Sequence, residues 1–175
     1  MTPLARITVR SLPSDPTKGR LMAAGTAFPC SLGRSGIRTT KREGDGATPS
    51  GRYRALGAFW RSDRLGRPRT PLRLSPIGPA SGWCDDPADR NYNKPVELPY
   101  RTSAEALRRQ DGLYDIVVDL DWNRGPITKG RGSAIFLHVA AARLAPTEGC
   151  IALSRRDLRK LLPRIGPGTI FDVRR

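Results

Sequence analysis

The chain has 175 residues, a length that suits one domain around one sizeable core. Its formal net charge of +15 favours anionic surfaces or polymers, but the basic residues show no zinc-finger spacing, basic helix or aromatic RNA-binding signature. Nucleic-acid binding is therefore an alternative and not the expected main function. No segment is apolar for long enough to span a bilayer, and no secretory signal is visible at the start of the sequence.

The first sixty residues predict short strands joined by turns. Alternating apolar residues over 5–9 indicate a half-buried strand, and residues 20–24 and 26–32 form a candidate hairpin with its turn near Gly25. Residues 33–46 are polar and rich in turn residues, which is typical of a solvated loop. A further strand is expected over 51–60, with Tyr53, Ala55, Gly57 and Phe59 on one side.

Residues 61–101 are rich in loops, with one candidate strand at 72–77, and suggest an insertion or lid over a binding site. The segment carries aromatic rings beside carboxylates and amides, which suit a ligand with sugar, amide and ammonium groups. The candidate substrate-binding residues here are Trp83, Asp86, Tyr92 and Asn93. The alternative is a surface loop held by Asx turns.

A short helix is expected over 102–110, because Thr102 and Glu105 have the spacing of a capping box. The alternation over 114–121 then predicts a half-buried strand with Tyr114 and Ile116 on its inner face. Near the end of the chain, Ser154 starts the best helix candidate, Pro163 ends or kinks it, and residues 169–174 close the chain as a strand. The sequence therefore predicts a mainly β domain with one or two short helices.

The candidate catalytic residues lie within residues 133–154. The apolar run 134–139 is typical of an interior strand, and it ends on His138, the only histidine of the chain. Cys150 follows twelve positions later, after Gly149, so a turn could bring the thiol beside the imidazole. An imidazole next to a thiol can activate it, and we expect the pKa of Cys150 to fall below that of a free thiol. A structural cysteine and a core histidine are the equally weighted alternative.

The run Thr147-Glu148-Gly149-Cys150, with His138 before it, resembles the active-site motif of the L,D-transpeptidase catalytic domain, the YkuD type. In that motif a histidine at a strand end is followed by Ser/Thr-His-Gly-Cys. Glu148 stands in place of the second histidine, and Ala152 stands where members often carry Arg or Asn. A Thr-Pro-x-Gly turn at 48–51 resembles the segment before the motif in the same family.

The resemblance implies a curved sheet or sandwich and acyl transfer on peptidoglycan stem peptides. Cys150 would be the nucleophile and His138 the base, with Gly149 and Thr147 shaping the turn and oxyanion site. It also implies an amine acceptor or water, a carbapenem-type β-lactam as covalent inhibitor, and a periplasmic or cell-envelope location. Glu148 could bind an acceptor ammonium, while Arg143 or Arg155 could replace the anchor missing at Ala152. An inactive cell-wall-binding module remains an alternative.

The other cysteines, Cys30 and Cys84, are far apart in the sequence. In an oxidising compartment they could form a disulfide, but two unconnected buried thiols are the simpler reading. Three cysteines and one histidine lack the paired spacing of a zinc site, and no nucleotide-binding glycine motif is present. We therefore expect neither a metal nor another cofactor.

Overall fold

The computed structural model describes residues 2–175 and is mainly β, as the sequence predicts. Within that range it has one α-helix, α1 (Arg155–Leu161), and two 3₁₀ helices, η1 (Ala142–Leu144) and η2 (Leu162–Arg164). The strands are β1 (Arg6–Leu12), β2 (Asp15–Ala23), β3 (Thr26–Ser31), β4 (Ile37–Arg38), β5 (Thr48–Pro49), β6 (Gly51–Trp60), β7 (Leu74–Pro76), β8 (Ser81–Cys84), β9 (Pro95–Glu97), β10 (Ala104–Ala106), β11 (Ile116–Leu120), β12 (Phe136–Val139), β13 (Ile151–Leu153) and β14 (Ile170–Arg174).

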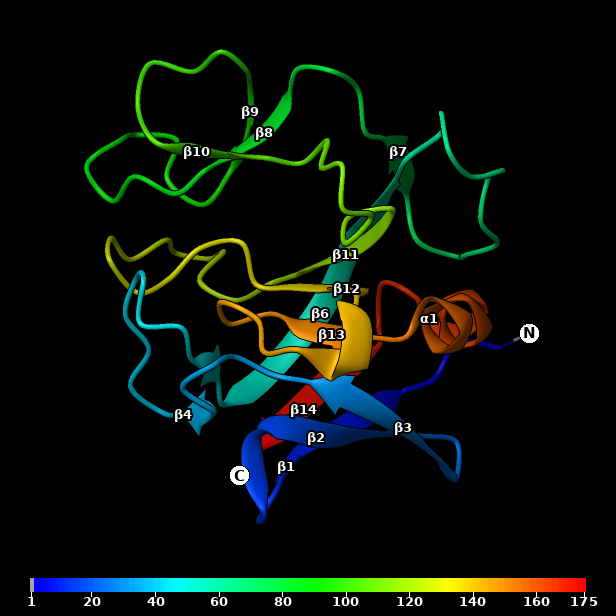
Figure 1. The fold of residues 1–175 in the computed structure, drawn as a ribbon. Coiled ribbons are helices and arrows are strands. Elements are labelled where there is room, and N and C mark those ends of the chain that lie inside the picture. Colours follow the sequence, from blue (N-terminus) through cyan, green and yellow to red (C-terminus); the bar gives the residue numbers. More distant parts are fainter. Residues whose placement is uncertain (1) are drawn as a thin grey trace.

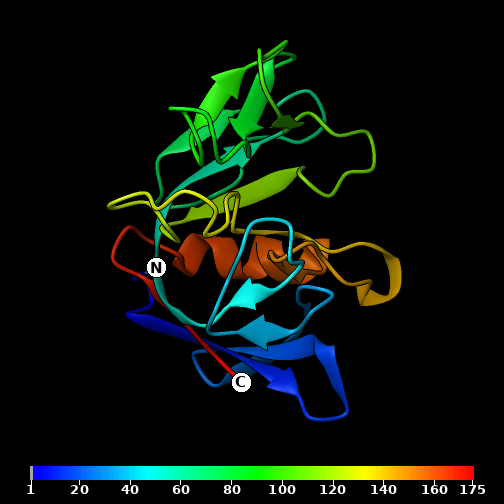
Figure 2. The ribbon, with the colours of Figure 1, turned by 90° about the vertical axis from the view of Figure 1, so that its left-hand side faces the viewer.

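The main sheet closes on itself. Its strand order is β11-β12-β13-β3-β2-β1-β14-β6-β7, and β11 at one end also pairs with β6. The predicted hairpin is confirmed as β2 and β3, whose turn at Ala24 and Gly25 has positive φ at both residues (49° and 79°). A turn of this hand matches the twist of the two strands. The result is a barrel-like curved sheet (Figures 1 and 2).

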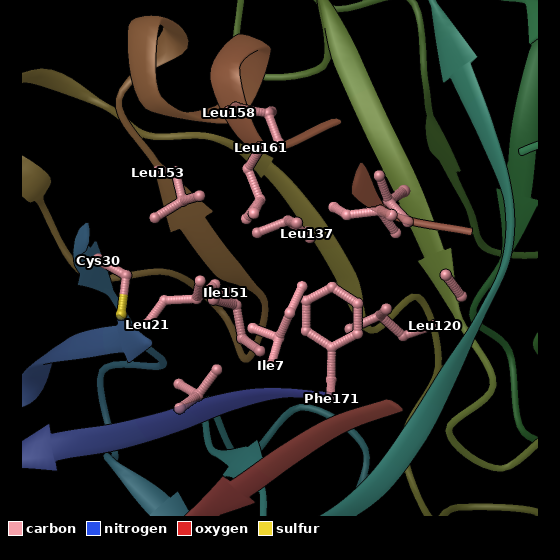
Figure 3. Close-up of a cluster of buried hydrophobic side chains, with 14 of the residues drawn as sticks. Ile7, Leu21, Cys30, Leu120, Leu137, Ile151, Leu153, Leu158, Leu161 and Phe171 are labelled. Carbon is pink, nitrogen blue, oxygen red and sulfur yellow. The ribbon is translucent and has the colours of Figure 1, made fainter. Parts of the chain in front are cut away.

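The barrel interior holds the main hydrophobic core. Side chains from β1, β2, β11, β12, β13 and β14 converge there, among them Ile7, Leu137 and Phe171, all fully buried (Figure 3). Helix α1 covers one end of this core with Leu158 and Leu161. Its predicted N-cap is confirmed, because the Ser154 hydroxyl accepts the Asp157 amide at 3.1 Å.

Strands β11 and β12 are buried on both faces. Leu137 and Val139 of β12 face the barrel core, whereas Phe136 belongs to a second apolar cluster on the other face. The expected half-buried strand at 114–121 is therefore wrong, because every residue of β11 is buried. The face that its alternating polar residues suggested was solvated is covered, since Val117 packs in the second apolar cluster with Trp83 and Leu107. The acidic side chain of Asp119 is paired with Arg124 at 3.0 Å.

The outer half of β6 also departs from simple alternation. A register irregularity opposite Leu120 shifts the pattern, so that Ala58 faces the barrel core while Phe59 packs half-buried against the second cluster. A bulge of this kind inserts one residue on one strand and reverses the faces beyond it. Phe59 therefore does not share the inner face with Tyr53 and Ala55 as predicted.

The segment above the barrel forms a small sheet of its own, which we call the lid sheet, with order β10-β8-β9 (Figures 1 and 2). The helix predicted over 102–110 is wrong, because residues 104–106 form β10 and pair with β8, with Glu105 opposite Trp83. Long-range pairing thus overrides a local capping pattern. No helix within residues 2–175 is both long and apolar enough to cross a membrane.

Candidate active site

A pocket of ≈ 590 Å³ lies between the lid sheet and the strands β12 and β13. It contains both residues on which the sequence analysis centred, Cys150 and His138. Its wall is completed by Glu43, Gly44, Asp85, Glu105, Arg109, Leu113, Tyr114, Ser133, Ala134, Ile135, Ala141, Ala145, Pro146, Thr147 and Glu148. The lid, the central strands and the loop before Cys150 therefore all contribute to one cavity.

Strand pairing brings Cys150 and His138 to the same face. β12 and β13 are parallel neighbours, with Leu137 opposite Ile151 and His138 opposite Ala152. Because side chains alternate along a strand, Leu137 and Ile151 point into the barrel core while His138 and Cys150 point toward the lid. The chain returns through η1 to make this parallel crossover, so the expected turn is a longer connection than a hairpin.

The contacts of His138 define its tautomer. Its Nδ1 lies 2.8 Å from the Val139 carbonyl, which can only accept, so Nδ1 carries the proton and Nε2 keeps its lone pair. The Tyr114 ring meets the imidazole edge-on, with centroids 5.2 Å apart. Burial lowers the pKa of His138 to about 4. At neutral pH the imidazole is therefore uncharged and can take a proton through Nε2.

The side chain of Cys150 is buried, and its sulfur contacts two backbone groups. Its Sγ donates to the Ala134 carbonyl at 3.1 Å and accepts the Phe136 amide at 3.4 Å, and the residue is 7% exposed. Burial raises the pKa of Cys150 to about 12, although the Phe136 amide acts in the opposite direction. The lowered thiol pKa expected from the sequence is not found. The resting pair is a neutral thiol and a neutral imidazole.

The loop before Cys150 is fixed by Thr147. The Thr147 hydroxyl donates to the Cys150 carbonyl at 2.7 Å and accepts the Gly149 amide at 3.1 Å. The Thr147 amide in turn donates to the Leu32 carbonyl at 2.9 Å, which docks the loop on the segment after β3. Thr147 and Gly149 therefore lie in one hydrogen-bonded turn before Cys150, in which the Thr147 hydroxyl takes up the Gly149 amide.

Glycine is required at position 149 for two reasons, the backbone conformation and the lack of space for a side chain. Its φ is +136°, and a Cβ there would lie 2.7 Å from the Ala47 carbonyl oxygen. We expect Gly149→Ala to lower the free energy of unfolding by more than the ~1–2 kcal/mol that left-handed backbone alone costs, and to slow Cys150 alkylation. Gly130→Ala is the matched control, since Gly130 also has positive φ (+78°) but nothing within 4 Å. Equal losses in chemical denaturation for the two variants would contradict this account.

The proposed substrate-binding residues of the lid do not line the pocket. Trp83 and Tyr92 are each 1% exposed. Asn93 is equally buried, and its Oδ1 accepts from the Trp83 indole at 3.1 Å and from the Ala134 amide at 3.0 Å. Asp86 accepts the Ala88 amide in an Asx turn. Aromatic and amide groups here tie the lid to the chain leading into β12, because they pack inward instead of facing the cavity.

The charged residues around Cys150 also take definite places. Glu148 lines the pocket, but its side chain is 78% exposed and pairs with Arg34 at 2.9 Å. Arg143 and Arg155 lie outside this cavity, and Arg155 pairs with Asp115 at 2.6 Å. Neither arginine replaces the anchor missing at Ala152, which is itself fully buried beside His138.

Among the pocket residues that sequence reasoning missed are Asp85, Glu105, Arg109 and Tyr114. The Tyr114 hydroxyl donates to Glu105 at 2.7 Å, and the Arg109 guanidinium lies over the Tyr114 ring at 5.2 Å. The only local signal was the alternation that put Tyr114 on one side of a strand. The sequence predicts a helix at Glu105 and Arg109, and a helix there gives no reason to place them at Cys150.

Cys30 and Cys84 are free thiols in different sheets, Cys30 in β3 and Cys84 in β8. No group of three His, Cys, Asp or Glu side chains among the described residues has the arrangement of a metal site.

We expect Cys30→Ser to keep full chemical activity at Cys150, because Cys30 belongs to the barrel core and not to the pocket. The variant should lose about 1–3 kcal/mol in the free energy of unfolding, since it buries a hydroxyl among apolar side chains. Alkylation kinetics and chemical denaturation measure the two effects separately. Loss of reactivity at unchanged stability would show that the wrong cysteine had been chosen.

A family model, the L,D-transpeptidase catalytic domain (YkuD), matches residues 15–173. The chain therefore belongs to the L,D-transpeptidase catalytic domain family. Among solved structures, L,D-transpeptidase 1 from Mycobacterium tuberculosis is similar, with 15% identity and a TM-score of 0.41, over 96% of this chain and 61% of that chain. This chain thus spans less than two thirds of that protein's length. No match was found among curated protein sequences.

Proposed function

We propose that the protein catalyses acyl transfer on peptidoglycan stem peptides through a thioester at Cys150. The observation that carries this proposal is the pairing of β12 with β13, which sets the thiol and the free Nε2 of His138 on one face of one pocket. Family membership supports the substrate class, a peptide bond between an L-centred residue and a D-amino acid. The expected location is the cell envelope, and the expected covalent inhibitor is a carbapenem-type β-lactam.

In the first half-reaction, Sγ of Cys150 attacks the carbonyl carbon of the donor peptide while Nε2 of His138 accepts the thiol proton. The tetrahedral intermediate then expels the terminal D-amino acid, whose amine takes the proton from Nε2. The C–N bond is broken, and a thioester is left on the enzyme. The Phe136 amide, which already points at Sγ, favours the thiolate as it forms.

In the second half-reaction, an acceptor amine attacks the thioester carbonyl and gives its proton to Nε2. The C–S bond breaks, Cys150 recovers its proton, and a new peptide bond joins the two stems. If water attacks instead, the same steps release a shortened stem, which is carboxypeptidase activity. Because burial keeps both groups neutral at rest, the proton passes from Sγ through Nε2 to the leaving amine, and a proton from the acceptor returns through Nε2 to Sγ.

The experiment is incubation of the protein with defined tetrapeptide muropeptides, followed by mass spectrometry. Release of the terminal D-amino acid together with crosslinked dimers supports transpeptidation, whereas shortened stems alone support the hydrolytic form. Intact stems with measurable binding would favour an inactive cell-wall-binding module. Salt-sensitive binding to DNA without any of these results would favour the nucleic-acid alternative.

A further inference from the structure

The outer side of the barrel carries a cluster of exposed arginines. Side chains alternate along a strand, and the odd-numbered residues of β1, β2 and β14 point into the core, among them Ile7, Leu21 and Phe171 (Figure 3). Tyr53 and Ala55 of β6 do the same. The even-numbered residues therefore point outward. Six of them are exposed arginines, which we call the basic face: Arg6 and Arg10 of β1, Arg20 of β2, Arg52 and Arg54 of β6, and Arg174 of β14.

The basic face holds a single carboxylate for its six arginines. That carboxylate is Asp172 of β14, which is only 3% exposed and accepts the Nε of Arg174 at 2.9 Å. The Arg174 guanidinium holds the pKa of Asp172 below its ordinary value, and the charges of Arg52 and Arg6 act in the same direction. Within residues 2–175, Arg174 is the one member of the basic face that makes an ion pair.

Three of the arginines lie side by side on neighbouring strands. Arg10 is directly opposite Arg20 of β2 on one side and Arg174 of β14 on the other. Like charges at directly opposed positions destabilise a sheet, because the two Cβ atoms are only about 5 Å apart. Asp172 offsets the charge of Arg174 alone. The arrangement therefore costs stability in the free protein, and a negatively charged partner would relieve that cost.

Exposed apolar side chains lie on the same outer side as these arginines. Among the described residues, the exposed large hydrophobic side chains are Met22 and Leu56, at 40% and 44% exposure. Met22 lies two residues beyond Arg20 on β2, and Leu56 lies two residues beyond Arg54 on β6. Basic side chains attract anionic headgroups, and apolar side chains can enter the boundary between headgroups and acyl chains.

The basic face extends over an area and does not follow a line. Its arginines come from four adjacent strands, which lie about 4.8 Å apart, and occupy successive outward positions along them. No aromatic side chain stands among the outward residues of β1, β2 and β14, or among those of β6 between Arg52 and Leu56, to stack on a base. An extended, headgroup-covered surface fits this arrangement better than a nucleic-acid strand does.

The basic face lies on a different side of the barrel from Cys150. In the strand order of the closed sheet, β1 and β14 lie across the barrel from β12 and β13. The lid sheet and the strands β1 and β2 accordingly lie at opposite ends of the molecule (Figures 1 and 2). A partner bound to the basic face would leave the pocket between the lid sheet and β12 uncovered.

We propose that the basic face binds the surface of a bilayer that contains anionic phospholipids. The guanidinium groups bind phosphate oxygens of the headgroups, and Met22 and Leu56 enter the headgroup boundary. The contact is made at the bilayer surface by the outer side of the barrel. It uses none of the residues of the catalytic pair, so this proposal does not depend on the proposed acyl transfer.

Sedimentation with lipid vesicles tests the proposal on the whole protein. One set of vesicles is phosphatidylcholine alone, and the other is equal parts of phosphatidylcholine and phosphatidylglycerol. We expect binding to the second set only, and we expect salt to weaken it. Arg10→Gln combined with Arg20→Gln should weaken binding roughly twentyfold, because each arginine near an anionic surface favours the bound state by about fivefold. Arg10→Lys combined with Arg20→Lys keeps the charge and should bind nearly as the wild type does.

The matched control is Arg90→Gln combined with Arg156→Gln. It removes the same charge from two exposed arginines outside the basic face, one between β8 and β9 and one in α1. Its binding should stay within about twofold of the wild type. Chemical denaturation shows whether each variant is folded. Arg10→Gln should be at least as stable as the wild type, because it removes the repulsion from Arg20 and Arg174.

A second pair of substitutions separates a lipid surface from nucleic acid. Met22→Ser combined with Leu56→Ser should weaken vesicle binding several-fold and leave any binding to duplex DNA unchanged, because DNA offers no apolar layer. Equal binding to both sets of vesicles would overturn the proposal, as would binding to neither or equal losses in the Arg10 and Arg20 double variant and its control. Duplex DNA bound as tightly as the anionic vesicles, with the same dependence on Arg10 and Arg20, would assign the basic face to nucleic acid instead. Stem peptides that give no product would refute the acyl transfer and leave the basic face standing.

Discussion

Cys150→Ala is expected to abolish all acyl transfer while the protein stays folded. The thiol is the only group in the pocket that can form the thioester, so its loss removes the reaction path and not merely part of its rate. In the fold, Sγ contributes two weak sulfur hydrogen bonds to Ala134 and Phe136, so we expect a loss of only about 1–2 kcal/mol in the free energy of unfolding.

The matched control is Cys84→Ala, which removes another buried free thiol from the lid sheet. It should retain product formation at a similar cost in stability. Product release is measured with tetrapeptide stems, and stability by chemical denaturation. Transfer by Cys150→Ala at more than a trace of the wild-type rate would end the thiol mechanism.

The second large effect is expected for His138→Gln in the alkylation of Cys150 by a small uncharged reagent. In the wild type, the pKa of His138 is about 4 and that of Cys150 about 12, so both groups are neutral between these values. The reactive thiolate then arises by proton transfer to Nε2 within the pair. Because no proton is exchanged with solvent, its population does not change with pH, and the rate should be flat from about pH 5 to about pH 9.

In His138→Gln this internal route is lost, and the thiolate must form by loss of a proton to solvent. The rate should therefore rise about tenfold per pH unit over the same range and lie roughly 10²–10⁴ below wild type at neutral pH. In denaturant both proteins should alkylate with the ordinary profile of a free thiol. Identical native profiles for the two proteins would make His138 a core histidine.

The sequence predicts those features that depend on residues close together in the chain. The apolar run before His138 indicated a strand covered on both faces, and β12 is such a strand. Ser154 and Asp157 marked the start of α1 because a cap is a contact between near neighbours. The Gly149 requirement followed from its place in a turn, although the contact with Ala47 could not be foreseen.

The features that the sequence does not predict all depend on the position of the lid sheet. The pattern at Thr102 and Glu105 satisfies a capping box, but pairing with β8 stabilises a strand there instead. The polar alternation of β11 suggested solvent on one face, which the lid and the Asp119–Arg124 pair fill. Composition alone could not say whether Trp83 faced a ligand or the interior. The position of the lid sheet is needed to see that Glu105 lines the pocket. It is also needed to see that Cys150 is buried, which raises the pKa of its thiol.

The most direct test of the central claim is to trap the acyl-enzyme. The protein is mixed with a defined tetrapeptide stem, quenched in acid within the first turnover, digested and mapped by mass spectrometry, with a parallel sample treated with hydroxylamine. The mechanism predicts a stem fragment lacking its terminal D-amino acid, attached at Cys150 and released by hydroxylamine as a thioester should be. Product formation with no adduct at Cys150, or with the adduct on another residue, would contradict it.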